Sequence, residues 1–226
     1  MIFKSALLRK DGVFEEVFLS WDVCVAAGYT GRDQKGVMAH VEELRKIGVP
    51  APERVPSMYW VEPDRVMSSS LLWVVGEACS GEGEVFLARD EKGNLCVTVA
   101  SDHTDRALET VSVAKAKQIC SKIVAPLFWR VDEIRAHWDS IELRTWVDGE
   151  LYQEGTLGQM LPPEKLFELA KEDAPAEGRI SLFSGTLAVL GEGIVYGTDW
   201  AMSLKDPVLG REIRHEYTVR ILPDRN

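Results

Sequence analysis

The segment that determines the fold is Gly81-Glu82-Gly83-Glu84-Val85-Phe86-Leu87-Ala88, because two carboxylates stand two residues apart at the head of an apolar run. Alternate residues of a β-strand project to one face, so a strand here predicts both carboxylates on the same side. If that face is buried, each charge costs several kcal/mol, and a divalent cation is the simplest compensation. Asp102 offers a third oxygen ligand. On spacing alone, a solvated turn leading into a hairpin is the favoured alternative.

The composition predicts one main domain with a sizeable core, because the 226 residues are 46% hydrophobic. The formal net charge of −10 and the lack of a basic run argue against a nucleic-acid partner. A small anionic substrate held by a metal stays compatible with this charge. The cysteines contain no CxxC pair, so a zinc or redox motif is unsupported and reduced thiols are expected. They are Cys24, Cys79, Cys96 and Cys120.

The amino terminus carries charges on both sides of a short apolar stretch and lacks the apolar core of a signal peptide. No segment approaches the run of about eighteen apolar residues that a membrane span needs. We therefore expect a cytoplasmic protein with no membrane partner.

Short strands dominate the predicted secondary structure. The first twenty or so residues alternate around Asp11-Gly12 as a hairpin does, and helical spacing runs from Arg32 to Ile47 before Gly48. Further strands are predicted at 58–61, 71–75, 84–88, 95–100, 141–147, 180–183 and 217–222, and further helices at 104–120 and 163–171. The pattern indicates a β-rich α+β fold in a single catalytic domain, 1–226, that includes the hairpin at 1–25.

Five polar blocks follow one another in a fixed order. They are His40-Val41-Glu42-Glu43, Glu82-Gly83-Glu84, Ser101-Asp102-His103-Thr104-Asp105-Arg106, Val147-Asp148-Gly149-Glu150-Leu151-Tyr152-Gln153-Glu154-Gly155 and Ser184-Gly185-Thr186-Leu187. No single block is specific, but the ordered set over residues 28–220 resembles the fumarylacetoacetate hydrolase superfamily, in a divergent and largely uncharacterised branch.

The resemblance implies a mixed β-sheet roll of the fumarylacetoacetase C-terminal type with a few short helices, commonly a homodimer. It also implies that Glu82, Glu84 and Asp102 hold Mg²⁺, with Mn²⁺ or Ca²⁺ as alternatives. Three oxygen ligands leave about three octahedral positions for a 2-oxo acid and water. The metal would then act as a Lewis acid on the keto oxygen.

A histidine and a glutamate are the acid–base pair that the resemblance implies. His40 and Glu43 are three apart and so share a helix face, where the carboxylate would polarise the imidazole. The alternative is an exposed pair on a surface helix. His103 stands beside Asp102, but adjacent strand residues face opposite sides, so we exclude it from the metal ligands.

Other side chains are expected to bind substrate. Lys117 is the better match to the family's catalytic lysine, and Lys122 is its competitor. Arg106, Gln153 and Thr186 are predicted to contact substrate. Their alternatives are a structural salt bridge, a strand-edge hydrogen bond and a β-bulge, respectively.

The predicted function is a metal-dependent hydrolase or lyase that acts on a C–C bond of a small 2-oxo or 1,3-diketo acid. A hydratase or isomerase that stabilises the same enolate is the alternative, and a non-catalytic binding module is the third. Two departures from the family's pattern bear on the substrate. Glu62 stands where many relatives carry lysine, and Leu187 stands where they carry proline.

Overall fold

The protein is described by a computed structural model that covers residues 1–46, 51–191 and 193–225. Within its first helix the side chains of Gln34, His40, Glu43 and Leu44 are not described. The strands are β1 (Ile2–Leu8), β2 (Phe14–Ser20), β3 (Val23–Gly28), β4 (Ser57–Val61), β5 (Val66–Met67), β6 (Leu71–Val75), β7 (Cys79–Ser80), β8 (Gly83–Asp90), β9 (Leu95–Ser101), β10 (Thr104–Asp105), β11 (Lys122–Val124), β12 (Leu127–Arg130), β13 (Glu142–Val147), β14 (Glu150–Thr156), β15 (Ile180–Phe183), β16 (Asp199–Asp206) and β17 (Arg211–Leu222). The α-helices are α1 (Gln34–Lys46), α2 (Arg106–Glu109), α3 (Val113–Ile119), α4 (Val131–Ile134) and α5 (Pro163–Asp173).

Two sheets form the body of the described structure. The larger has ten strands in the order β4-β3-β15-β8-β2-β1-β12-β9-β11-β5, and an additional pairing of β8 with β9 closes its middle into a roll. The smaller has five strands in the order β14-β13-β16-β17-β6. Parallel and antiparallel pairs occur in both sheets, as in β1–β12 and β1–β2. The predicted β-rich mixed roll with few helices is confirmed.

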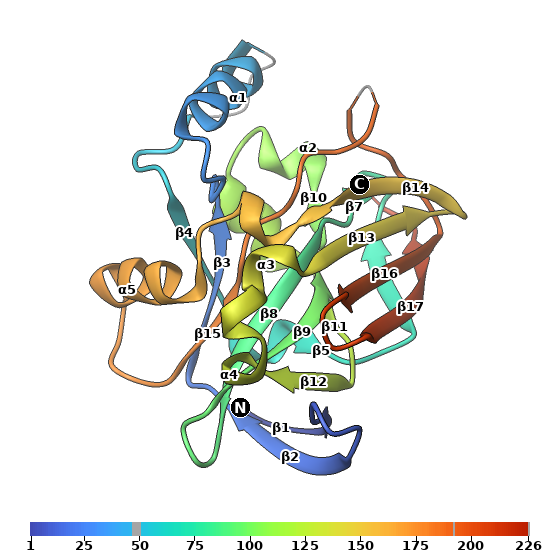
Figure 1. Cartoon of the computed structure of the whole chain (residues 1–226). Coiled ribbons are helices and arrows are strands. Elements are labelled where there is room, and N and C mark those ends of the chain that lie inside the picture. Colours follow the sequence, from blue (N-terminus) through green and yellow to red (C-terminus); the bar gives the residue numbers. More distant parts are fainter. Residues whose placement is uncertain (47–50, 192, 226) are drawn as a thin grey trace.

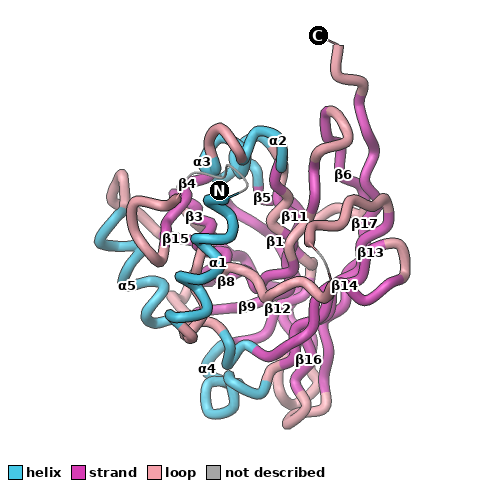
Figure 2. Tube along the Cα trace, turned by 90° about the horizontal axis from the view of Figure 1, so that it is seen from above, coloured by secondary structure: helices cyan, strands magenta, loops and turns pink. Residues whose placement is uncertain are grey.

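The five-stranded sheet lies on one side of the roll, and α1 and α5 lie on the other (Figures 1 and 2). Strand β8 is buried on both faces, which explains its unbroken apolar run. Phe86 packs into a cluster inside the roll with Leu19 and Phe128. Leu87 faces the larger core, which also takes residues of the five-stranded sheet. The head of β8 therefore stands where the two sheets meet.

The predicted helix over 104–120 is wrong as a single element, because the chain forms the short strand β10 and two helices there. Each helix has its own amino-terminal cap. The Asp105 carboxylate accepts from the N–H of Leu108, and the Ser112 hydroxyl accepts from the N–H of Lys115. The second cap starts α3, which packs against β4 and β10 and carries Lys117 to 3.5 Å from Glu82.

Other predicted elements are confirmed, including the amino-terminal hairpin β1–β2, helix α5 and the hairpin β13–β14. Gly12 adopts a φ of 81°, the left-handed conformation that suits glycine in such a turn. The strands that were not predicted are β3, β5, β7, β10, β11, β12 and β16. Among the described helices, none combines the length and the apolar character that a bilayer crossing requires.

Candidate metal centre

Three carboxylates converge at the head of β8. One oxygen from each of Glu82, Glu84 and Asp102 lies within 4.8 Å of the other two. Glu84 belongs to β8, Glu82 immediately precedes that strand, and Asp102 immediately follows β9. The side chain of Asp102 is fully buried and Glu84 is 1% exposed, whereas the Glu82 side chain is 22% exposed. The cluster thus has two buried members and one that opens toward solvent.

Strand pairing brings these carboxylates together. Gly83 pairs with Ser101 in the β8–β9 ladder, and the N–H of Asp102 donates to the carbonyl oxygen of Glu82 over 3.0 Å. Each ligand-bearing segment is therefore held by backbone contacts as well as by its side chain. The sequence predicted this convergence correctly, although the metal-binding role of the three residues stays a prediction.

The glycines on either side of Glu82 are required by packing. A Cβ on Gly83 would stand 1.8 Å from Oγ1 of Thr145 in β13. A Cβ on Gly81 would stand 2.6 Å from Oγ of Ser101 and 2.9 Å from Oη of Tyr217. The five-stranded sheet therefore packs directly against the backbone on either side of Glu82.

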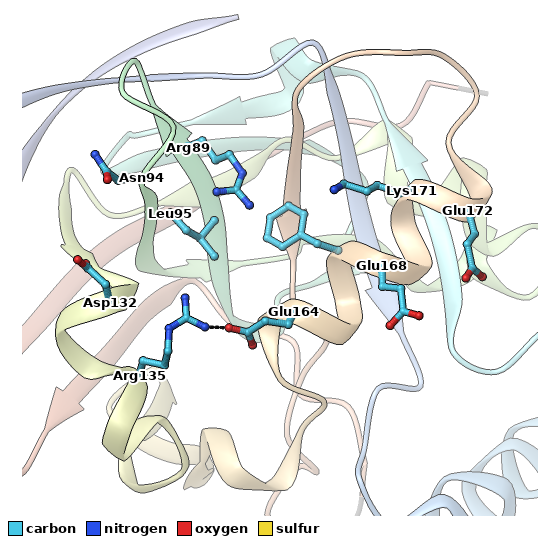
Figure 3. Close-up of a pocket in the computed structure, with 10 residues that line it drawn as sticks. Arg89, Asn94, Leu95, Asp132, Arg135, Glu164, Glu168, Lys171 and Glu172 are labelled. Carbon is cyan, nitrogen blue, oxygen red and sulfur yellow. Dashed lines mark ion pairs between the residues drawn. The ribbon is translucent and has the colours of Figure 1, made fainter.

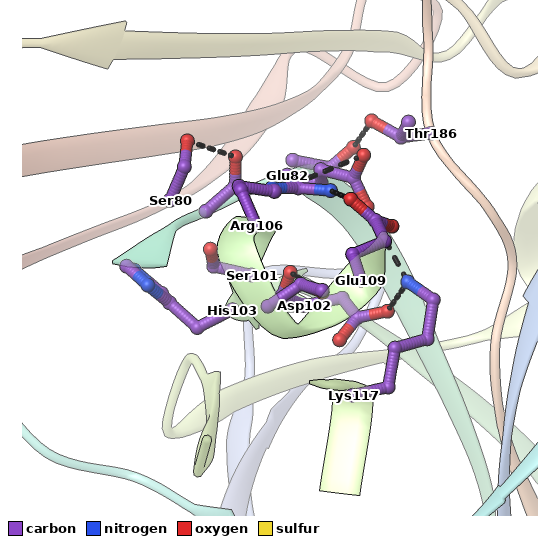
Figure 4. Close-up of polar contacts among 12 residues, drawn as sticks. Ser80, Glu82, Ser101, Asp102, His103, Arg106, Glu109, Lys117 and Thr186 are labelled. Carbon is purple, nitrogen blue, oxygen red and sulfur yellow. Dashed lines mark hydrogen bonds and ion pairs between the residues drawn. The ribbon is translucent and has the colours of Figure 1, made fainter. Parts of the chain in front are cut away.

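Basic side chains surround two of the three carboxylates (Figure 4). Nζ of Lys117 lies 2.5 Å from Oδ2 of Asp102 and 3.5 Å from Oε2 of Glu82. Nζ of Lys122 lies 2.5 Å from Oδ1 of Asp102, and Nη2 of Arg106 lies 3.2 Å from Oε1 of Glu82. A divalent cation is the simplest compensation that the sequence suggests, but basic side chains already compensate these two carboxylates. Both competing lysines contact the cluster.

Glu84 differs from its neighbours, because among the described residues no basic side chain forms an ion pair with it. Its Oε2 accepts a hydrogen bond of 2.9 Å from the N–H of Gly185. Gly185 has a φ of 82°, and a Cβ there would lie 2.2 Å from Oγ1 of Thr30, so glycine is required. The motif around residue 185 thus serves the cluster through a backbone N–H rather than through the Thr186 hydroxyl.

The electrostatic environment separates the three carboxylates. Burial raises the pKa of Glu84 well above its usual range, and the neighbouring charge of Asp102 adds to this. Burial would also raise the pKa values of Asp102 and Glu82, but the nearby ammonium and guanidinium groups outweigh it and lower both. The same carboxylates raise the pKa of Lys117 against the effect of burial. Glu82 and Asp102 are therefore anionic, and Glu84 is the member whose charge lacks compensation.

Arg106 also contacts Glu109, with Nη1 3.0 Å from Oε2, so this glutamate helps to fix the guanidinium beside Glu82. Sequence reasoning missed Glu109. Its spacing of three residues after Arg106 within a helix is the signal that could have identified it.

The predicted substrate-binding residues Gln153, which is buried, and Thr186, which is partly buried, both hydrogen-bond to the backbone of Gly83. Oε1 of Gln153 accepts from the N–H of Gly83 over 2.8 Å. Nε2 of Gln153 donates to Oγ1 of Thr186 and to the carbonyl oxygen of Leu187, each over 2.7 Å, and the Thr186 hydroxyl donates to the Gly83 carbonyl. These contacts position the ligand-bearing segment, and substrate contact by either residue stays a prediction.

His103 points away from the carboxylates (Figure 4), although Asp102 and His103 lie between β9 and β10 and not in one strand as predicted. Its Nε2 lies 2.7 Å from Oη of Tyr217, and that hydroxyl donates to Oγ of Ser101 over 2.8 Å. Burial and the nearby charge of Lys122 lower the pKa of His103 to about 3, so the ring is neutral. His40 and Glu43 belong to α1, but their side chains lie outside the described part of the structure. The predicted acid–base pair therefore stays a prediction.

A surface pocket of about 680 Å³ lies elsewhere, beside the far end of the β8–β9 hairpin (Figure 3). Acidic and basic side chains alternate along its walls, and Arg135 forms an ion pair with Glu164 there. The pocket contains none of the three clustered carboxylates.

The donor set fits a hard divalent cation. Opposite oxygen ligands stand about 4.2 Å apart around Mg²⁺ and about 4.8 Å apart around Ca²⁺, and the clustered oxygens lie within the larger of these separations. Oδ1 of Asp102 is buried, and its described partner is Nζ of Lys122, 2.5 Å away, so a cation that used this oxygen would share it with that ammonium group. Oxygen donors without a thiolate or imidazole favour Mg²⁺, Mn²⁺ or Ca²⁺ over zinc.

Comparison with solved structures identifies the fold. The chain superposes on 2-keto-3-deoxyarabinonate dehydratase with a TM-score of 0.63 and 17% identity, covering 88% of this chain and 74% of that one. Another structure of 2-keto-3-deoxy-D-arabinonate dehydratase, complexed with magnesium and 2,5-dioxopentanoate, gives a TM-score of 0.59 at 17% identity, with 89% and 74% covered. A yeast fumarylacetoacetate hydrolase family protein gives 0.59 at 13% identity, with 90% and 94% covered. The predicted resemblance to the fumarylacetoacetate hydrolase fold is confirmed.

Comparison by sequence gives a narrower result. A search of curated proteins found no match. The model of one family, described as "Protein of unknown function (DUF2848)", matches residues 27–217, which is most of the chain. The chain therefore belongs to this family of proteins of unknown function, and it carries the fumarylacetoacetate hydrolase fold.

Proposed function

We propose that this protein is a divalent-metal-dependent hydrolase or lyase that acts on a C–C bond of a small 2-oxo or 1,3-diketo acid. The observation that supports the proposal most strongly is the convergence of Glu82, Glu84 and Asp102 beside the ammonium group of Lys117. A cluster that contains cation ligands and a buried cation can hold an anionic substrate and stabilise charge that develops on it.

Glu82, Glu84 and Asp102 would hold the metal, which we propose to be Mg²⁺. When bound, the ion would supply Lewis-acid stabilisation to the enolate oxygen of the substrate. Lys117 would bind an anionic group of the same substrate, because its ammonium stays charged at neutral pH. Arg106 would hold Glu82 in place while Glu109 holds the guanidinium.

His40 and Glu43 are the proposed acid–base pair, as the family resemblance implies. The carboxylate would orient the imidazole, which would then take a proton from water or return one to the carbon that leaves. Water activation is needed for hydrolysis of the C–C bond but not for enolisation alone. Activity of a His40→Gln variant on a substrate that needs only enolisation would separate these two roles.

A hydratase or isomerase is the second candidate, and the likeness to a dehydratase complexed with magnesium and 2,5-dioxopentanoate favours it. Elimination of water next to a carbonyl uses the same enolate stabilisation, so the carboxylate cluster supports either reaction. A non-catalytic binding module on the same fold is the third candidate. It predicts ligand binding without turnover.

The test is a panel of acylpyruvates, oxaloacetate, 2-hydroxydienoates and 2-keto-3-deoxy sugar acids, each assayed with Mg²⁺, with Mn²⁺ and with a chelator. Metal-dependent turnover that is lost in Glu82→Ala and Glu84→Ala would support the proposal. Glu91→Ala is the matched control, because Glu91 is an exposed glutamate at the far end of the same β8–β9 hairpin. Turnover that survives the chelator would contradict it, and metal binding without any turnover would favour the module.

We further propose that the protein is a homodimer, as the family resemblance implies. The mass of one chain is 25.3 kDa, so light scattering should give about twice that value. A monomeric mass at the assay concentration would overturn this part of the proposal.

A further inference from the structure

Lys117 occupies an unusual position, because its ammonium group touches two of the three clustered carboxylates. Its Nζ stands 2.5 Å from Asp102 and 3.5 Å from Glu82, and its side chain is 7% exposed. Both distances fall within ion-pair range. The ammonium group therefore lies against the same oxygens that a divalent cation would need.

Every oxygen of Glu82 and Asp102 lies within 3.5 Å of a basic nitrogen. A carboxylate oxygen that coordinates a divalent ion donates a lone pair to that ion. The same lone pair can then no longer accept a hydrogen bond from a neighbouring ammonium group. Two cations that share one oxygen also repel each other at short range. A divalent ion can therefore bind tightly only if a basic group moves away from the carboxylate oxygen that it contacts.

Of the three basic side chains, Lys117 is in the best position to move away from the carboxylates. Lys122 is fully buried, touches one carboxylate and directs its hydrogen bond at the carbonyl oxygen of His103. Arg106 is held between Glu82 and Glu109. The side chain of Lys117 is long and flexible, and its ammonium group lies beside Glu82, the partly exposed member of the cluster. The ammonium group therefore has a short path toward the solvent-exposed side of the cluster.

We propose that Lys117 is an internal counter-ion that competes with the divalent cation for Glu82 and Asp102, and that cation binding releases its ammonium group to the substrate anion. This inference rests on the proposed function, because it assigns an order of events to the same site. A released ammonium group gains a partner when an anionic substrate is present. Metal and substrate should therefore bind with positive cooperativity, each tightening the other by the same factor.

The experiment measures the dissociation constant of Mn²⁺ by titration calorimetry on the full-length protein. Lys117→Met removes the charge and keeps most of the side-chain volume, and we expect it to bind Mn²⁺ at least tenfold more tightly than wild type. Asp102 and Glu82 keep Lys122 and Arg106 as partners in this variant. Lys115→Met on the same helix is the control, because Lys115 is exposed and its removal should change the constant by less than twofold.

Lys122→Met distinguishes competition from a general effect of charge. It removes an equal charge at an equal distance from Asp102 but leaves Glu82 untouched. A gain in Lys117→Met that clearly exceeds the gain in Lys122→Met supports the inference. Equal gains, or weaker binding in Lys117→Met, would overturn it.

Chemical labelling on wild-type protein gives a second readout that needs no variant. Reductive methylation of Lys117, followed by mass spectrometry, should increase severalfold when Mn²⁺ is added, because the released ammonium group becomes accessible. Unchanged or reduced labelling of Lys117 at saturating Mn²⁺ would contradict the inference. If neither wild type nor Lys117→Met binds Mn²⁺, the proposed function itself fails, so the two failures can be told apart.

Discussion

Glu84 is the residue of the proposed metal centre at which stability and function would oppose each other. Its carboxylate is buried, accepts a hydrogen bond from Gly185 and lacks the basic partners that its two neighbours have. Burial without a counter-charge raises the pKa of a carboxyl and disfavours its ionised form. The folded protein without metal therefore bears a cost that metal binding would offset.

Glu84→Gln should stabilise the metal-free protein by about 1 kcal/mol at pH 7, because the amide keeps the acceptor for the Gly185 N–H and replaces a carboxyl whose ionised form is disfavoured by burial. A raised folded-state pKa lowers stability above the unfolded value near 4.3, so the difference should shrink as pH falls toward about 4. Urea unfolding with a chelator at pH 7 and pH 4 measures it. A destabilised variant at pH 7 would show that Glu84 has a counter-charge in the metal-free protein.

Gly83→Ala should disrupt the site, since the added Cβ would collide with the Thr145 hydroxyl. We expect a loss of about 2–3 kcal/mol and no measurable metal affinity, because Gly83 lies between two of the proposed metal ligands. Thr145→Ala in the same chain removes the colliding oxygen and should recover part of both losses. Thermal unfolding and calorimetry test the pair, and a Gly83→Ala variant that binds metal normally would refute this role for Gly83.

At the residue scale, strand alternation placed Glu82 and Glu84 on one face, but spacing alone favoured a solvated turn, and only the family resemblance joined Asp102 to them. The sequence did not indicate their basic partners. Lys117, Lys122 and Arg106 come from separate elements, and no local spacing shows that all three side chains turn inward. The sequence therefore predicted a single site lysine, either Lys117 or Lys122, whereas both lysines contact Asp102.

At the element scale, the turn between β16 and β17 depends on one buried carboxylate. Asp206 accepts from the N–H groups of Val208 and Leu209 and lies 3.0 Å from Nε2 of His137. Burial would raise the pKa of Asp206, but these hydrogen bonds outweigh burial and lower it. A lowered folded-state pKa adds stability above the unfolded value near 3.9, and that stability is lost as pH falls through the folded value.

Asp206→Asn should therefore cost about 1–2 kcal/mol at pH 7, and the difference from wild type should shrink below about pH 4. Asp11→Asn is the control, because Asp11 is half-exposed in another hairpin turn and should change stability by less than about 0.5 kcal/mol. Urea unfolding across this pH range is the measurement. A constant difference between Asp206→Asn and wild type at all pH values would show that the Asp206 charge contributes nothing.

Element boundaries show where sequence patterns fail. The segment 104–120 has helical composition throughout, yet caps at Asp105 and Ser112 divide it. Strand β16 was missed because it follows a glycine-rich stretch and mixes polar with apolar residues. It is stabilised by pairing with both β13 and β17 instead. Tertiary pairing overrides local propensity in such segments.

At the scale of the whole molecule, the candidate site depends on both sheets. The roll supplies the three carboxylates, while the five-stranded sheet supplies Thr145, Gln153 and Tyr217 against the backbone of residues 81–83. A ligand bound at this junction is therefore coupled to the packing of one sheet on the other.

Metal binding should accordingly raise the thermal stability of the entire protein. Mn²⁺ at about 100 times its dissociation constant should add about 2.7 kcal/mol, which corresponds to about 5–10 °C in Tm for a chain of this size. The Glu82→Ala, Glu84→Ala double variant should show no such shift. Scanning calorimetry measures both, and an equal rise in the double variant would place the bound ion elsewhere.

The most direct measurement is anomalous diffraction from crystals of the wild-type protein soaked in Mn²⁺. We expect one strong anomalous peak coordinated by oxygens of Glu82, Glu84 and Asp102, with metal–oxygen distances of about 2.1–2.2 Å. A map with no peak among these carboxylates at millimolar Mn²⁺ would contradict the central claim that they form a divalent-metal centre.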